Sequence, residues 1–229
     1  MADQNLTKPQ LRTPKAAGAA GMLFSLLAIV SFWLLWVAVP ADPQEAGAWL
    51  HGSAGMVALA VNLMPFSGIA LLWFIAVLRD RMSEREDRFF ATVFLGSGLL
   101  FIAMYFLAAA VVGAILAVFV AEPAALINSA TYHFARALAY AILNVYMIKM
   151  AVVFMIATST AAIYTDITPR ALSMIGYALA LLLLFASYYV RWSFLLFPFW
   201  IFLLSGWIVI QAVRTAPGGR LSGHPERNI

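Results

Sequence analysis

The chain has 229 residues, of which 64% are hydrophobic and only 10% are charged. A soluble domain carries about 25% charged residues because its surface contacts water, so the composition excludes an ordinary soluble protein. The net charge is only +4, and most basic residues flank apolar segments, as expected for membrane orientation rather than nucleic-acid binding. The absence of cysteine excludes disulfides, thiolate metal sites and cysteine nucleophiles.

The apolar segments predict an all-α, polytopic membrane protein, because each is long enough to cross a bilayer as a helix of about 20 residues. A membrane β-barrel would instead show strands of about ten residues with alternating polarity. Residues 1–16 are expected to be a flexible basic segment and residues 214–229 a disordered tail, on either side of one transmembrane domain at 17–213. The six predicted helices occupy residues 17–39, 53–78, 89–120, 137–163, 171–190 and 193–213.

Three local features refine these helices. Trp33 and Trp36 lie near the end of the first helix, a position typical of the headgroup boundary. The third helix exceeds the roughly 30 Å hydrocarbon core, so it tilts, kinks or projects outward. Residues 132–136 are expected to form an interfacial segment that precedes the fourth helix.

The basic residues predict the orientation. With six spans, eleven of the fourteen basic residues fall on the side of the two termini, only Arg136 and Arg191 fall on the other side, and Lys149 lies within a span. This asymmetry predicts a multi-pass protein of the cell membrane with both termini cytoplasmic. The eleven are Lys8, Arg12, Lys15, Arg79, Arg81, Arg85, Arg88, Arg170, Arg214, Arg220 and Arg227.

Lys149 is the strongest functional candidate, because a charged group in hydrocarbon costs several kcal/mol and usually marks a functional site. It is predicted near the midpoint of the fourth helix, and no predicted span contains an acidic partner. Three interpretations remain open: a neutral amine, a side chain that extends to the interface, or a position facing a wet cavity. Regular α-helical geometry places Lys149 about 140° from Asn144 around the helix.

The second helix has a polar interruption at Asn62, Pro65 and Ser67. Proline removes one backbone hydrogen bond, so a kink is expected that frees the Val61 carbonyl. Such breaks coordinate solutes in many transporters, although proline also merely curves ordinary spans. Because Lys149 is a donor without an acidic partner, we expect it to point at the Asn62–Pro65 break, with the second and fourth helices in contact.

A further polar face lies near the start of the fourth helix, where His133, Arg136, Tyr140 and Asn144 recur at helical spacing. The functional interpretation is an outer vestibule that attracts anions, and the structural one is an ordinary helix start at the lipid boundary. No histidine or carboxylate set has the spacing of a metal or haem site, and no nucleophile motif is present. We therefore expect no metal and no cofactor, and the missing motifs favour a protein that is not an enzyme.

Two functions from different classes are compatible with these residues. The first is a channel or transporter for an ion or small solute, with a path lined by Asn62, Pro65, Ser67, Asn144 and Lys149. The second is a non-catalytic accessory or scaffold subunit of a membrane complex. Its docking surfaces, in a homo-oligomer or with another partner, would be the small-residue faces of helix 89–120 and the charged loop 79–88.

Overall fold

The computed structural model describes residues 14–40, 42, 45–82, 88–165, 168–186 and 192–214. All its regular elements are helices, and no described residue belongs to a β-strand. The helices are α1 Pro14–Ala38, α2 Leu50–Met82, α3 Arg88–Ala121, α4 Pro123–Leu126, α5 Ala130–Ala141, the π-helix η1 Ile142–Met147, α6 Ile148–Thr165, α7 Arg170–Ala186, the 3₁₀ turn η2 Ser193–Leu195 and α8 Leu196–Arg214.

Five helices within the described residues are long and apolar enough to cross a membrane. They are α1, α2, α3, the continuous rod formed by α5, η1 and α6, and η2 with α8. The helical prediction is therefore confirmed for a multi-pass membrane protein. The fifth predicted span, residues 171–190, corresponds to α7, whose 17 described residues reach only about 26 Å. The sixth crossing, the cytoplasmic termini and the type of membrane stay predictions.

Helix boundaries differ from the predictions mainly at the fourth span. The predicted interfacial segment 132–136 is part of α5, which starts at Ala130 after Ser129. The Ser129 side chain accepts a hydrogen bond from the backbone N–H of Tyr132 and so caps the helix. At the other end of the chain, α1 begins at Pro14, inside the segment predicted to be flexible. The charged loop at 83–87 and the tail beyond Arg214 lie outside the described residues.

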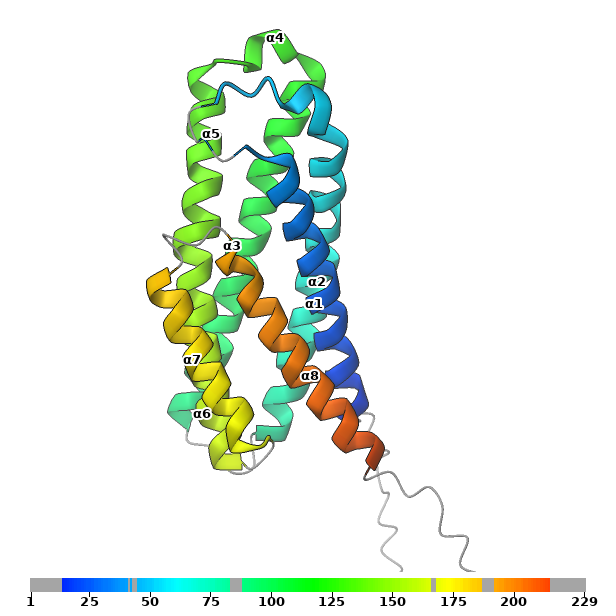
Figure 1. Ribbon diagram of the computed structural model, residues 1–229, viewed down its shortest axis with the longest axis vertical. Helices are drawn as coiled ribbons and strands as arrows, with labels where there is room; N and C mark the ends of the chain where they lie inside the picture. Colours follow the sequence, from blue (N-terminus) through cyan, green and yellow to red (C-terminus); the bar gives the residue numbers. More distant parts are fainter. Residues whose placement is uncertain are drawn as a thin grey trace, which may run out of the picture.

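The bundle is organised around three long rods, α2, α3 and α5–η1–α6, each about 50 Å long. Helix α2 packs mainly against α1 and α3, and α6 packs against α3 and α7. Helices α7 and α8 accompany the rods only over the half of the molecule nearest the described termini (Figure 1). Both ends of the described chain lie at the same end of the bundle, opposite α4 (Figure 1).

The other half of the molecule forms a smaller unit, here called the distal head: residues 50–58 of α2, residues 111–121 of α3, α4 and α5. It has its own apolar cluster, separate from the main core. The members of this cluster are Leu50, Ile115, Phe119, Leu126 and Tyr132. Since the hydrocarbon core is about 30 Å thick, rods of about 50 Å extend beyond it, and the distal head is the part that does so on the α4 side.

Candidate functional site

Lys149 lies at the start of α6 and is half-buried. Its Nζ donates a hydrogen bond of 3.2 Å to the backbone carbonyl of Leu184. That carbonyl belongs to the last turn of α7, where carbonyl groups have no partner inside the helix and where a positive charge interacts favourably with the helix dipole. Lys149 therefore acts as a cap for the C-terminal end of α7.

The depth of Lys149 follows from its neighbours. The adjacent residue Ile148 lines the same small void as Phe32 of α1, and Trp33, next to Phe32, is half-exposed and packs against Trp36. Paired tryptophans at the end of a span are typical of the headgroup boundary. These neighbours favour a position of Lys149 near that boundary, where a charge is far less costly than at the bilayer centre. Lys149 nevertheless lies close to the middle of the continuous rod Ala130–Thr165, as predicted for its helix, and its depth in a bilayer stays a prediction.

The π-helix η1 lies directly before Lys149 and contains Asn144. A π-helix closes its hydrogen bonds over five residues instead of four, so each residue turns through less than 100°. The separation of about 140° between Asn144 and Lys149 assumed regular α-helical geometry, and η1 reduces it. Asn144 is half-buried, and its Nδ2 donates to the carbonyl of Tyr140, one turn earlier.

The polar interruption of α2 does not point into the bundle. Asn62 and Pro65 are exposed, whereas Ser67 is buried and donates to the carbonyl of Phe24 in α1. The Asn62 Nδ2 donates to the carbonyl of Ala58 in its own helix. In the part of the chain that the structure describes, the Asn62 side-chain oxygen has no hydrogen-bond partner. The α2 helix continues through Pro65 without a break in assignment.

The predicted pairing of Lys149 with the Asn62–Pro65 break does not form. Lys149 bonds to α7, and α2 has only a marginal contact with α6. Helix α3 contacts both α2 and α6 and separates them. Of the five predicted path residues, the structure thus places Ser67 between α1 and α2, Asn62 and Pro65 on the outer face, and Asn144 and Lys149 on the α5–η1–α6 rod.

Arg136, predicted in an outer vestibule, binds the loop between α1 and α2. Its guanidinium donates to the hydroxyl of Tyr132 at 3.1 Å and to three backbone carbonyls of that loop. The carbonyls are those of Pro40, Asp42 and Glu45. An arginine fork that points at carbonyl oxygens holds a loop in one position, so this arrangement favours the structural interpretation of Arg136.

Tyr132 completes the loop contact. Its hydroxyl accepts a hydrogen bond of 2.9 Å from Trp49 Nε1, and its buried ring packs against Gly47. Gly47 has a φ of 86°, and a Cβ at that position would lie 2.9 Å from the tyrosine ring, so glycine is required there for both conformation and space. Of the other predicted vestibule residues, Tyr140 is exposed and His133 is half-buried with its ring against Tyr132.

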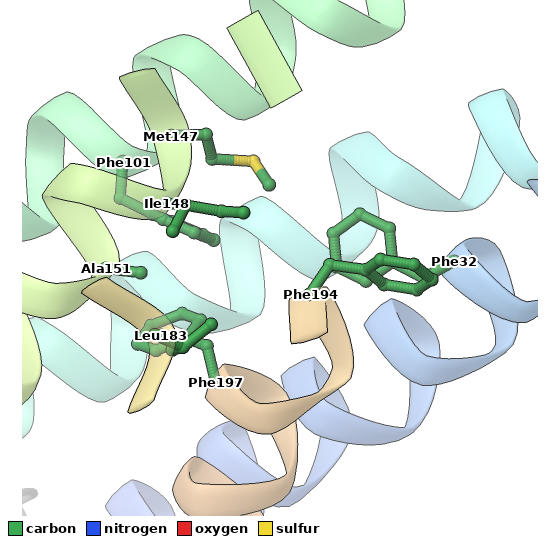
Figure 2. A pocket seen from close by; sticks show the side chains of 8 residues that line it. All are labelled: Phe32, Phe101, Met147, Ile148, Ala151, Leu183, Phe194 and Phe197. Atoms are coloured by element: carbon green, nitrogen blue, oxygen red, sulfur yellow. The ribbon is translucent and has the colours of Figure 1, made fainter. Parts of the chain in front are cut away.

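One small void lies where α1, α3, η1, α6, α7 and α8 meet, close to Lys149. Its volume is about 10 Å³, close to the minimum that holds one water molecule. Figure 2 shows that only carbon and sulfur side chains surround it, so the void offers no polar group to a solute. The lining residues are Phe32, Phe101, Met147, Ile148, Ala151, Leu183, Phe194 and Phe197.

One further polar pair was not predicted from the sequence. Ser159 Oγ of α6 and Trp200 Nε1 of α8 are fully buried without a hydrogen-bond partner among the described residues. Both atoms lie beside Gly176 of α7, within 2.1 Å and 2.9 Å of the position where a Cβ would be. Serines and tryptophans are common in spans, so only the three-helix contact distinguishes these two.

Within the described residues, no group of three histidines and carboxylates is close enough to hold a metal ion. Comparison of the chain with protein families, with curated proteins and with solved structures finds no match. The apolar helices define the class of the protein: it is a multi-pass integral membrane protein that contacts the lipid bilayer.

Proposed function

We propose that the chain is a non-catalytic subunit of a membrane protein complex, which binds its partner through a helix face within the bilayer. The observation that carries this proposal is the outward position of Asn62 on α2. An asparagine on a membrane-facing surface stabilises contact with another helix, because its amide finds few partners in hydrocarbon.

The depth of Asn62 supports this interpretation. The bond between Ser67 of α2 and the Phe24 carbonyl of α1 sets the register of these antiparallel helices. Counting five residues from this bond toward the α4 end of the bundle, Asn62 of α2 is level with Ile29 of α1. Ile29 lies one turn, about 6 Å, inside the boundary at Trp33. The free amide oxygen of Asn62 is therefore within the hydrocarbon layer, where an unsatisfied polar group is costly.

The positions of the two basic residues also favour an assembly role. Lys149 is used as the cap of α7 and Arg136 as the holder of the loop between α1 and α2. Neither one faces the void at the centre of the bundle, which is apolar. A proposed docking role for the loop 79–88 or for helix α3 remains compatible with this function, although residues 83–87 lie outside the described part.

Transport of a small solute or ion is the second candidate, and one observation favours it. Ser159 and Trp200 place two unpaired polar groups inside the α6–α7–α8 contact, and Lys149 uses one of its three N–H donors within the described residues. A path between these helices would be distinct from the one predicted along Asn62, Pro65 and Ser67.

One pair of variants separates the two candidates. Asn62→Val should release the chain from a larger complex on native electrophoresis in mild detergent, without loss of folded protein. Lys149→Met should leave that complex intact and change the stability by about 1 kcal/mol or less, as expected for one hydrogen bond. If the wild-type chain migrates alone and conducts ions or solutes in liposomes, and Lys149→Met abolishes that flux, the transport function is correct instead.

A further inference from the structure

The outward face of α2 carries a regular heptad pattern. Its residues recur at alternating intervals of three and four over three heptads, and every one of them is exposed. We call this set the α2 seam: Gly52, Gly55, Leu59, Asn62, Phe66, Ile69 and Trp73. We infer that the seam binds the α2 seam of a second copy of this chain, in parallel, around a two-fold axis along the membrane normal. This inference rests on the proposed assembly function.

The spacing of the seam fits helix pairing. Residues that repeat at intervals of three and four form the contact line of a left-handed coiled coil, and one polar residue in that line fixes the register. Asn62 is the single amide in the seam and lies at its centre. The side chains that surround it, Leu59, Phe66 and Ile69, are the apolar type that packs in such a line.

The two glycines leave room for a second backbone. A Cβ added to Gly52 or Gly55 would meet no atom within 4 Å, so nothing in this chain requires glycine at either position. Small residues allow backbones of neighbouring helices to approach closely, and these two glycines would do so at the distal-head end of the seam. Gly96 of α3 has the same open surroundings, and it lacks a nearby outward asparagine, which makes it a suitable control.

A second copy fits this surface better than a different protein because the seam is complementary to itself. Copies with the same membrane orientation bring identical helices together in parallel, so each seam residue meets its counterpart at the two-fold axis. The Asn62 amide has a donor and an acceptor and can pair with another Asn62. The seam contains no charged residue that would select a partner of opposite charge.

Two aromatic side chains of the seam supply about a quarter to two fifths of the area that a standard interface buries per partner. From Gly52 to Trp73 the seam extends about 32 Å, of which the part from Leu59 to Trp73, about 21 Å, lies below the distal head. Phe66 and Trp73 leave 65% and 64% of their surfaces exposed. Since a buried aromatic side chain removes about 150–250 Å² from solvent, these two alone offer about 200–300 Å² per copy, against roughly 800 Å² per partner in a standard interface.

Disulfide crosslinking tests the inference, because the chain has no native cysteine. The full chain carrying Ile69→Cys, in phosphatidylcholine vesicles, should form disulfide dimers at dilutions where Leu99→Cys does not. Leu99 is the matched control, exposed to a similar degree on α3. Adding Asn62→Val to the Ile69→Cys chain should weaken dimerisation about fivefold to thirtyfold, as expected for an interhelical amide bond.

A second pair of variants separates dimerisation from folding. Gly55→Leu should abolish the Ile69→Cys crosslink, whereas Gly96→Leu should leave it intact, and both should retain the thermal unfolding temperature of the parent chain. Equal crosslinking at Ile69 and Leu99, or none at Ile69, would overturn the inference. If crosslinks are absent but Asn62→Val still releases a different protein from the native complex, the second copy is wrong while the assembly function stands. If no association depends on Asn62, both are wrong.

Discussion

The contact of Arg136 with the loop between α1 and α2 provides the sharpest stability prediction. Two of its four hydrogen bonds, to the Pro40 carbonyl and the Tyr132 hydroxyl, are partly buried, and the other two are exposed. A sheltered bond from a charged donor contributes about 1.5–3 kcal/mol, whereas exposed ones contribute little. Arg136→Gln retains at most one of these bonds and should therefore destabilise the loop by about 2–3 kcal/mol.

Hydrogen exchange measures this local effect directly. The amides of Asn128 and Leu50 donate to the carbonyls of Ala46 and Gly47 in the loop, at 3.1 Å each. At 1.4 kcal/mol per factor of ten, their exchange in the Arg136→Gln chain should accelerate about 30-fold to 150-fold. Arg136→Lys keeps the charge without the planar fork and should give an intermediate value.

The control is Arg79→Gln, which removes an exposed arginine at the opposite end of α2 and should leave exchange in the loop unchanged. A change of less than threefold for Asn128 and Leu50 in Arg136→Gln would show that the loop is held by other contacts. An equal acceleration throughout α5 would show that the variant unfolds the distal head instead of releasing the loop.

Two further substitutions test the packing. Gly47→Ala should lower the thermal unfolding temperature and accelerate exchange in the same loop, because it forces an L-residue to a positive φ and a Cβ against the Tyr132 ring, at about 1–3 kcal/mol. Ser159→Ala should be neutral or stabilising in a thermal unfolding assay, since its hydroxyl has no partner in the described structure. Thr160→Val, one residue away, should destabilise by about 1 kcal/mol because it removes the 2.6 Å bond to Tyr177.

The sequence predicted the helical membrane fold because long apolar segments have few alternatives in a bilayer. It was less successful at helix ends. The polar residues between Tyr132 and Arg136 suggested an interface, but they belong to a helix capped by Ser129 that rises into the distal head. This error leaves Lys149 close to the midpoint of its helix, because the rod Ala130–Thr165 extends beyond the predicted bounds at both ends.

The partners of the candidate residues could not be predicted from the sequence. Lys149 binds a carbonyl 35 residues away, and Arg136 binds carbonyls more than 90 residues away. Backbone carbonyls carry no sequence signal, so a search for acidic partners could not find them. The choice between the inward and outward face of α2 also required the structure, because Asn62 and Ser67 lie in the same helix but face differently.

The π-helix η1 has a consequence for how the chain tolerates insertions and deletions. One residue more or fewer in a helix rotates everything beyond it by about 100°, and a π-helical stretch is equivalent to one added residue. On one side of η1, Arg136 faces the loop between α1 and α2, and on the other side Lys149 faces α7. Removing one residue from Ile142–Met147 should therefore restore α-helical geometry and leave both side chains facing their partners, because the π-helix already absorbs the rotation of the added residue. Within this rod, we expect η1 to tolerate the loss of one residue better than α5 or α6 does, since a deletion in a regular α-helix rotates one side chain away from its partner.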